Sequence, residues 1–197
     1  SIIRVKEPSL LIASQITFCQ EIAQTNFTPL GRVLRHAIPK SAKKLSDASA
    51  DSSSNLEPKL TKTETTTLAR FLKQKKPALW VNETLENTFA FALAHTMNTK
   101  GKQTLILVPE ILQLLPLEAE ALSYFSPSSI AILHSHLTPK EYRSNWKRIQ
   151  SGEATLILAT RQGLFAPFSN LGAVIVTEEQ DQGYKQWDII QKLLFKQ

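Results

Sequence analysis

Short runs of consecutive apolar residues alternate with longer amphipathic stretches along the second half of the chain. The apolar runs cover residues 78–81, 104–108, 129–133, 155–159 and 173–176, and apolar residues at helical spacing cover residues 87–98, 110–124 and 140–150. Apolar runs of this length, rich in Val, Ile and Leu, are typical of strands covered on both faces. The pattern therefore predicts an α/β fold, in which helices flank a parallel sheet.

The first part of the chain has a different pattern. Apolar residues at helical spacing predict a helix over residues 10–25 and a short second helix over residues 32–36, which Pro39 ends. Residues 41–60 are rich in Ser and charged side chains, which is typical of a flexible linker, and a further helix is predicted over residues 60–76. We therefore expect an N-terminal helical segment at residues 1–40, a linker at residues 41–59 and an α/β lobe at residues 60–197.

Composition narrows the class of partner. With 197 residues, of which 42% are hydrophobic, the chain can bury one ordinary core. Its 23 Lys and Arg residues outnumber 17 Asp and Glu residues, and this net charge of +6 favours a polyanion such as nucleic acid. Cys19 is the only cysteine, which excludes an internal disulfide and fits a reducing, cytoplasmic setting. No apolar run approaches the ~18 residues of a membrane span, so we expect no membrane association.

Polar side chains follow the predicted strands at the edge where parallel sheets bind ligands. The candidates for DNA contact are Pro109, Glu110, His134, Ser135, Thr160 and Arg161, and the next helix adds Lys140, Arg143 and Lys147. The hydroxyl of Thr160 and the guanidinium of Arg161 suit contacts to sugar and phosphate. Helix capping is an alternative role for Glu110, and a solvated basic face is the alternative for the three cations of the helix. His134 and His136 lack a Cys or carboxylate partner, so we expect no metal site.

Four segments occur in a fixed order. They are TLILVPEI at residues 104–111, AILHSHLT at 131–138, ATRQGLFAPF at 159–168 and AVIVTEEQDQGYKQ at 173–186. In this order they resemble the first motor lobe of the PriA-type primosomal replication-restart helicases, a branch of superfamily 2, over roughly residues 60–186. Residues 8–39 also resemble the join between the 3′-end-binding and winged-helix domains of that family. The resemblance implies a RecA-like lobe that grips one DNA strand and moves along it with ATP and Mg²⁺.

The phosphate cradle of the family, its Walker A motif, is altered in this chain. The motif reads G-x-T-G-S-G-K-T, and its glycines fall on Val81, Thr84 and Glu86. Its lysine falls on Asn87, and only the final threonine is kept, as Thr88. Glycines let backbone N–H groups wrap the phosphates, and the lysine neutralises their charge. We therefore expect that this segment no longer binds ATP.

The acidic motif of the family, D-E-E-H, is altered as well. A buried strand that delivers acids to the ligand edge is typical of sites that hydrolyse phosphate esters. The resemblance places the aspartate that organises the metal on Thr177 and the coupling histidine on Gln180, whereas Glu178 and Glu179 are kept. The second motor lobe of the family and its cysteine-rich zinc region have no counterpart in this sequence.

We therefore expect a PriA-like remnant that neither hydrolyses ATP nor unwinds DNA by itself and uses no cofactor. It would bind single-stranded or forked DNA weakly, or a replication-restart partner. An alternative is a fragment or divergent form of an ATP-dependent 3′–5′ DNA helicase that another chain completes with a second lobe. A further alternative is a decaying product without a selected role, because the residues after Trp187 depart from the family.

Overall fold

A single parallel sheet forms the centre of the computed structural model, which describes residues 11–25, 27–38, 56–74, 76–81, 87–181 and 184. Within these ranges the strands are β1 (Gln103–Leu107), β2 (Ile130–Leu133), β3 (Leu156–Ala159) and β4 (Leu171–Val176). Their order is β2-β3-β1-β4, and all three pairings are parallel. The predicted α/β, RecA-like parallel sheet is confirmed, and these four strands lie close to their predicted bounds.

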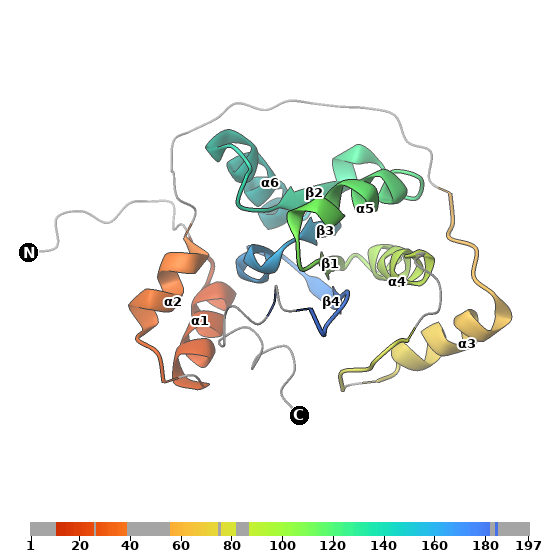
Figure 1. Cartoon of the computed structure of the whole chain (residues 1–197), viewed down its shortest axis with the longest axis horizontal. Coiled ribbons are helices and arrows are strands. Elements are labelled where there is room, and N and C mark those ends of the chain that lie inside the picture. The colour runs from red at the N-terminus through yellow and green to blue at the C-terminus, as the bar shows by residue number, and fades with distance from the viewer. Residues whose placement is uncertain are drawn as a thin grey trace, which may run out of the picture.

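Helices cover both faces of the sheet (Figure 1). The described helices are α1 (Ala13–Thr25), α2 (Leu30–Ala37), α3 (Lys62–Phe71), α4 (Thr88–Thr99), α5 (Leu114–Ala121) and α6 (Pro139–Ser151). Successive residues of β1 point to opposite faces, so Ile106 packs with α4 and α5 while Leu105 and Leu107 pack with Ile149 of α6. The two apolar clusters therefore enclose β1, β2 and β3, as their unbroken apolar runs predict. Edge strand β4 differs from the prediction, because Leu171 and Val174 are exposed.

The predicted strand at residues 78–81 is wrong, because this segment pairs with none of the described strands. The indole of Trp80 instead stacks on Phe89 of α4, with ring centroids 4.5 Å apart and an interplanar angle of 11°. It also meets Phe71 of α3 edge-on, at a centroid distance of 6.4 Å. These aromatic contacts join the segment to the helices rather than to the sheet.

The predicted helix at residues 110–124 is interrupted. A 3-10 turn, η1 (Ile111–Gln113), comes first, and α5 begins at Leu114. Pro116 explains this start, because proline lacks an N–H group and is tolerated in the first turn of a helix but not in its interior. The sequence pattern therefore predicted a helix in the right region but placed its first residue too early.

The N-terminal helices pack on the lobe beside the 3-10 turn η3 (Arg161–Phe165). Cys19 and Ile22 of α1 share one apolar cluster with Trp146 and Phe165. The buried side chain of Gln15 donates from Nε2 to the carbonyl of Phe165 at 2.7 Å.

The predicted domain boundaries stay a prediction, because most of the linker lies outside the described residues. Among the described residues, no helix combines the length and apolar character needed to cross a membrane.

Gln103 connects three segments at the start of β1. Its buried side chain donates from Nε2 to the carbonyls of Ile149 and Ala154 at 2.9 and 2.7 Å. Its Oε1 accepts from the N–H groups of Ser169 and Asn170 at 2.8 and 3.2 Å. One amide thus satisfies buried backbone groups at the end of α6, before β3 and before β4.

Replacing this amide should destabilise the lobe. In Gln103→Leu the carbonyl of Ala154 and the N–H groups of Ser169 and Asn170 lose this partner, whereas the carbonyl of Ile149 keeps its bond from the N–H of Gly152. We expect the free energy of unfolding to fall by about 3 kcal/mol. Urea denaturation measures the change, and Gln150→Leu at an exposed position of α6 serves as the control, with an expected change within about 0.5 kcal/mol. A loss no larger than that of the control would show that these bonds contribute little.

Candidate nucleotide and nucleic-acid site at the carboxyl ends of the strands

The parallel strands deliver the candidate residues to one edge of the sheet. Because the spatial order is β2-β3-β1-β4, the loop with His134 lies beside the loop with Arg161, followed by the loop with Glu110 and the loop with Glu178. Arg161, the cationic candidate among these loops, therefore follows β3, the acidic candidates follow β1 and β4, and the loop after β2 leads to Lys140, Arg143 and Lys147 on α6. This edge is polarised in charge.

Gln113 joins the two acidic loops. Its Oε1 accepts from the backbone N–H of Glu110 at 3.2 Å, and its Nε2 donates to Oε1 of Glu178 at 2.8 Å. Glu110 is the N-cap of η1, where its side chain accepts from the backbone N–H of Gln113. The capping role that the sequence allowed for Glu110 is therefore present, while DNA contact by Pro109 and Glu110 stays a prediction.

Thr177 directs its hydroxyl into the sheet. Both its Oγ1 and its N–H donate to the carbonyl of Leu107, at 3.1 and 3.0 Å. The hydroxyl of Tyr184 donates to the same carbonyl at 3.0 Å and to the carbonyl of Thr177 at 3.1 Å. Burial raises the pKa of Tyr184, so its hydroxyl stays protonated and able to donate. The side chain of Thr177 is thus engaged with the backbone of β1.

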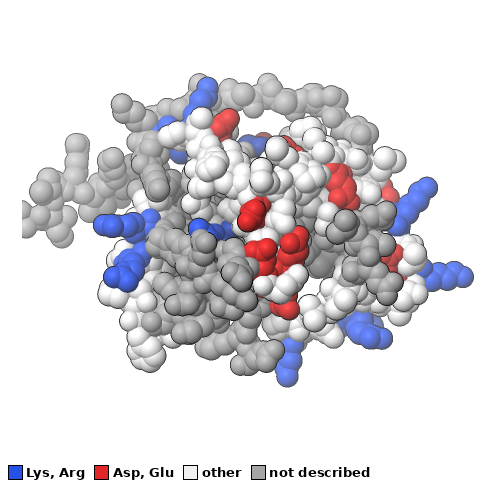
Figure 2. Space-filling view, viewed as in Figure 1, with Lys and Arg blue, Asp and Glu red and all other residues white. Residues whose placement is uncertain are grey.

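Glu178 has an unusual backbone conformation. Its φ of +49° lies in the left-handed region, which costs a residue with a side chain about 1 kcal/mol or more. Exposed Glu179 follows, together with exposed Gln180 and half-buried Asp181. Figure 2 shows acidic side chains gathered near the centre of this face. Within the described ranges, no three His, Cys, Asp or Glu side chains converge as a metal site would require.

A carboxylate of the chain itself is bound at the start of α4. The backbone N–H and the Nδ2 of Asn87 donate to the two carboxylate oxygens of Glu120 on α5, at 3.2 and 2.9 Å. The first N–H groups of a helix lack partners within the helix and favour negative charge, so this is where a phosphate would bind. The predicted cradle positions Thr84 and Glu86 lie outside the described residues, and Thr88 is the first residue of α4.

A histidine side chain in the loop after β2 forms a hydrogen bond with the backbone of the same loop. The backbone N–H of His136 donates to Nδ1 of His134 at 3.2 Å, and Ser135 between them is exposed. Burial is the largest cause that lowers the pKa of His134, followed by the nearby His136, whereas Glu141 opposes the shift. The neutral imidazole that accepts this bond is therefore the favoured form.

Helix α6 begins with a capping box in which Thr138 and Glu141 bind each other's backbone N–H groups. Lys140 and Lys147 are exposed, and half-buried Arg143 donates from Nε to the carbonyl of Pro139 at 2.9 Å. The helical spacing of these three residues places them along one side of α6. Their contact with DNA stays a prediction.

Arg148, next to this basic series, has a structural role. Its Nη2 donates to the carbonyl of Ile130 at 2.9 Å and also to the carbonyl of Ser128, while its Nε pairs with Glu153 at 3.1 Å. It therefore fastens α6 to the start of β2.

The loop after β3 places a hydroxyl and a guanidinium on the basic half of the edge, beside the loop after β2. Thr160 is buried, and its N–H donates to the carbonyl of Leu133 at 3.1 Å, which continues the pairing of β3 with β2. Arg161 is half-buried at the start of η3. The guanidinium is therefore held close to the sheet rather than on a long exposed loop.

The sequence is similar to curated replication-restart proteins, although no family model matches the chain. It is 44% identical to replication restart protein PriA of Haemophilus influenzae over 88 residues, which are 45% of this chain and 12% of that protein. PriA of Buchnera aphidicola is 38% identical over 105 residues, 53% of this chain and 14% of that protein. PriA of Bacillus subtilis is 39% identical over 87 residues, 44% of this chain and 11% of that protein.

The chain thus contains a PriA-type region, which confirms the resemblance, and it spans about an eighth of the length of the curated relatives it matches. The loss of the nucleotide-binding motifs stays a prediction.

Titration of the ring protons of His134 by NMR tests the loop after β2. We expect a midpoint below the ordinary value of about 6.5, because burial disfavours the imidazolium. His136→Gln should raise the midpoint by removing a like charge, and Glu141→Gln should lower it by removing an opposite charge. The bond to the N–H of His136, and the stability it contributes, should be lost as the pH falls from about 6.5 through the folded pKa. A midpoint at or above the ordinary value would contradict the geometry of this loop.

Proposed function

We propose that this chain is a PriA-like replication-restart remnant that binds DNA or a replication partner without hydrolysing ATP. The similarity of the region to PriA supports a role in replication restart, and cytoplasmic location is part of the proposal. The chain spans about an eighth of the length of those relatives, so any activity or partner shared with them is part of the proposal.

The observation that carries the proposal is the carboxylate of Glu120 at the start of α4. A triphosphate bound there would have to displace this carboxylate from Asn87, with which it makes two hydrogen bonds. Asn87 would offer the phosphates an uncharged amide in place of a lysine. Two like charges 4 Å apart repel by about 1 kcal/mol in water and by about 4 kcal/mol near a protein surface. The residues at this position do not fit ATP.

The acidic loop supports the same proposal. A hydroxyl in place of a carboxylate at Thr177 is a poor ligand for Mg²⁺, and this hydroxyl donates to the carbonyl of Leu107. Glu178 is bound to the amide of Gln113. No step of phosphate hydrolysis is therefore assigned to these residues.

Binding of DNA would use the basic half of the edge. Arg161 and the α6 residues Lys140, Arg143 and Lys147 would contact phosphates, with His134, Ser135 and Thr160 beside them. The carboxylates after β1 and β4 would repel the same backbone, so we expect weak, salt-dependent binding. A replication-restart protein is the other partner that the similarity to PriA supports.

One observation favours the alternative of an ATP-dependent helicase completed by a second lobe. Glu178 is kept, and its left-handed backbone is the kind of strain that gathers at functional sites. In that case a nucleotide would bind and stabilise the chain, whereas the remnant would not respond.

The chain should not hydrolyse ATP. We expect release of radiolabelled phosphate in the presence of Mg²⁺ and forked DNA to equal that of Glu178→Gln, and a thermal-shift titration with ATP to leave the melting temperature unchanged. Bound ligand at about 100 times its Kd would stabilise the fold by about 2.7 kcal/mol, which such a titration detects easily. Turnover above that of Glu178→Gln, or a saturable rise in melting temperature, would favour the helicase alternative.

Arg161→Ala should weaken binding to single-stranded DNA in fluorescence anisotropy. Each lost phosphate contact reduces the slope of log K against log salt by about 0.7. Lys102→Ala, which removes an exposed cation at the opposite edge of the sheet, should have a smaller effect. Equal effects of the two substitutions would remove Arg161 from the binding surface.

A further inference from the structure

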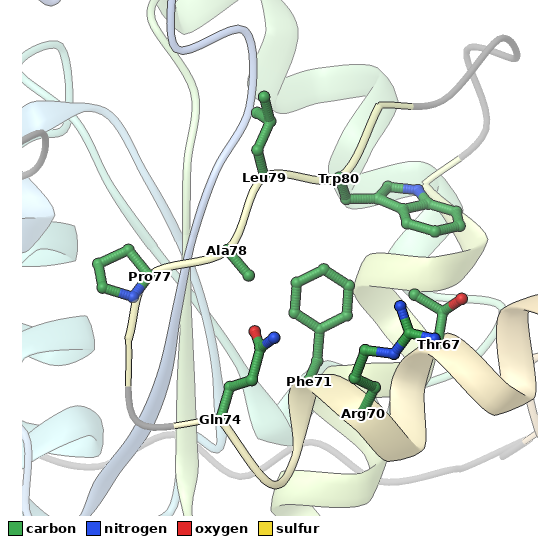
Figure 3. A pocket seen from close by; sticks show the side chains of 8 residues that line it. All are labelled: Thr67, Arg70, Phe71, Gln74, Pro77, Ala78, Leu79 and Trp80. Carbon is green, nitrogen blue, oxygen red and sulfur yellow. The ribbon is translucent and has the colours of Figure 1, made fainter.

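A cavity of about 450 Å³ lies away from the strand edge, between the C-terminal half of α3 and the segment at residues 77–80. Side chains of Arg70 and Phe71 from α3, and of Gln74 just after it, face this segment across the cavity (Figure 3). Trp80 closes the side nearest α4. The volume falls within the ~300–1,000 Å³ range of sites that hold small organic groups.

The aromatic wall of this cavity is held in place from behind. The indole of Trp80 stacks on Phe89 at 4.5 Å between centroids, and Phe71 meets Phe89 edge-on at 5.6 Å. Phe89 is buried in one cluster with Leu68 and Ala92, so the three rings rest on α3 and α4. Aromatic rings fixed in this way offer a preformed surface for another flat ring.

Arg70 lines the same cavity, and Lys73 and Lys76 are next in the chain to the lining residues Gln74 and Pro77. Helix α3 ends at Phe71, earlier than the sequence predicted, so Lys73 and Lys76 follow it as exposed residues beside Arg70. Among the described residues, no carboxylate forms an ion pair with any of these three cations. In Figure 2 basic side chains project from the margin where α3 lies, whereas the acidic side chains gather near the centre. This surface is complementary to an anion.

We propose that this cavity takes an unpaired nucleobase of single-stranded DNA, an inference that rests on the proposed function and places one of its DNA contacts. The base stacks against Phe71 and Trp80, and the amide of Gln74 can both donate to and accept from its edge. Arg70, Lys73 and Lys76 contact the adjoining phosphates. A fixed aromatic wall within a basic surface suits single-stranded nucleic acid better than an apolar peptide, which has no charge for the three cations.

Anisotropy with a labelled oligo-dT of about 20 nucleotides tests the assignment. We expect Arg70→Gln to weaken binding about tenfold, which corresponds to the loss of one charge-assisted hydrogen bond to a phosphate. The matched control Lys102→Gln removes the same charge elsewhere and should weaken binding less than about twofold. An abasic oligonucleotide of equal length should bind about tenfold more weakly than oligo-dT, because it offers phosphates without bases.

Tryptophan fluorescence reports on contact with Trp80 itself and does not depend on the overall charge of the chain. Oligo-dT should quench the emission of the chain, and Trp80→Phe, which keeps an aromatic ring on Phe89, should abolish most of that quenching. Equal effects of Arg70→Gln and Lys102→Gln would overturn the cavity as a base site, while weakening by Arg161→Ala would still support the proposed function.

Two further results would also overturn the assignment. If the unaltered chain binds no oligonucleotide at low salt, the DNA part of the proposed function fails with it. If a Leu-rich amphipathic peptide quenches Trp80 and oligo-dT does not, the cavity serves a protein partner instead.

Discussion

The N-cap residue of α4, Asn87, needs acceptors for its backbone N–H and its side-chain amide, and the carboxylate of Glu120 provides both. The contact joins α4 to α5, and the two helices pack together on one face of the sheet. In the proposed function, this contact is what keeps a triphosphate from the start of α4. A helix start that attracts phosphate in an open site is here satisfied by a side chain from within the lobe.

The parallel topology then distributes charge along the remaining edge. Acidic residues follow β1 and β4, Arg161 follows β3, and the exposed cations Lys140 and Lys147 lie on α6. Gln113 ties the two acidic loops together, while Tyr184 and Thr177 both bond to the carbonyl of Leu107. An edge organised in this way is suited to a weak contact with a polyanion on its basic half. The separate cavity beside α3 adds cations and fixed aromatic rings at some distance from the acids.

The sequence predicted the helices and strands that a local pattern of residues specifies. It missed the contacts between residues that are far apart in the chain. The four strands were predictable because both of their faces are apolar, and the start of α6 because Thr138, Pro139 and Glu141 are adjacent in the chain. The segment at residues 78–81 has the same apolar pattern, yet Trp80 packs on helices, which periodicity cannot distinguish. The bonds of Gln103 and the contact of Glu120 with Asn87 join residues at least 33 positions apart, so no local signal marks them.

A crystal structure grown with Mg²⁺ and a nonhydrolysable ATP analogue tests the central claim most directly. The account predicts that both carboxylate oxygens of Glu120 stay within hydrogen-bond distance of the backbone N–H and the Nδ2 of Asn87, with no phosphate density at the start of α4. Clear triphosphate density against Asn87 and Thr88, with Glu120 displaced, would contradict it.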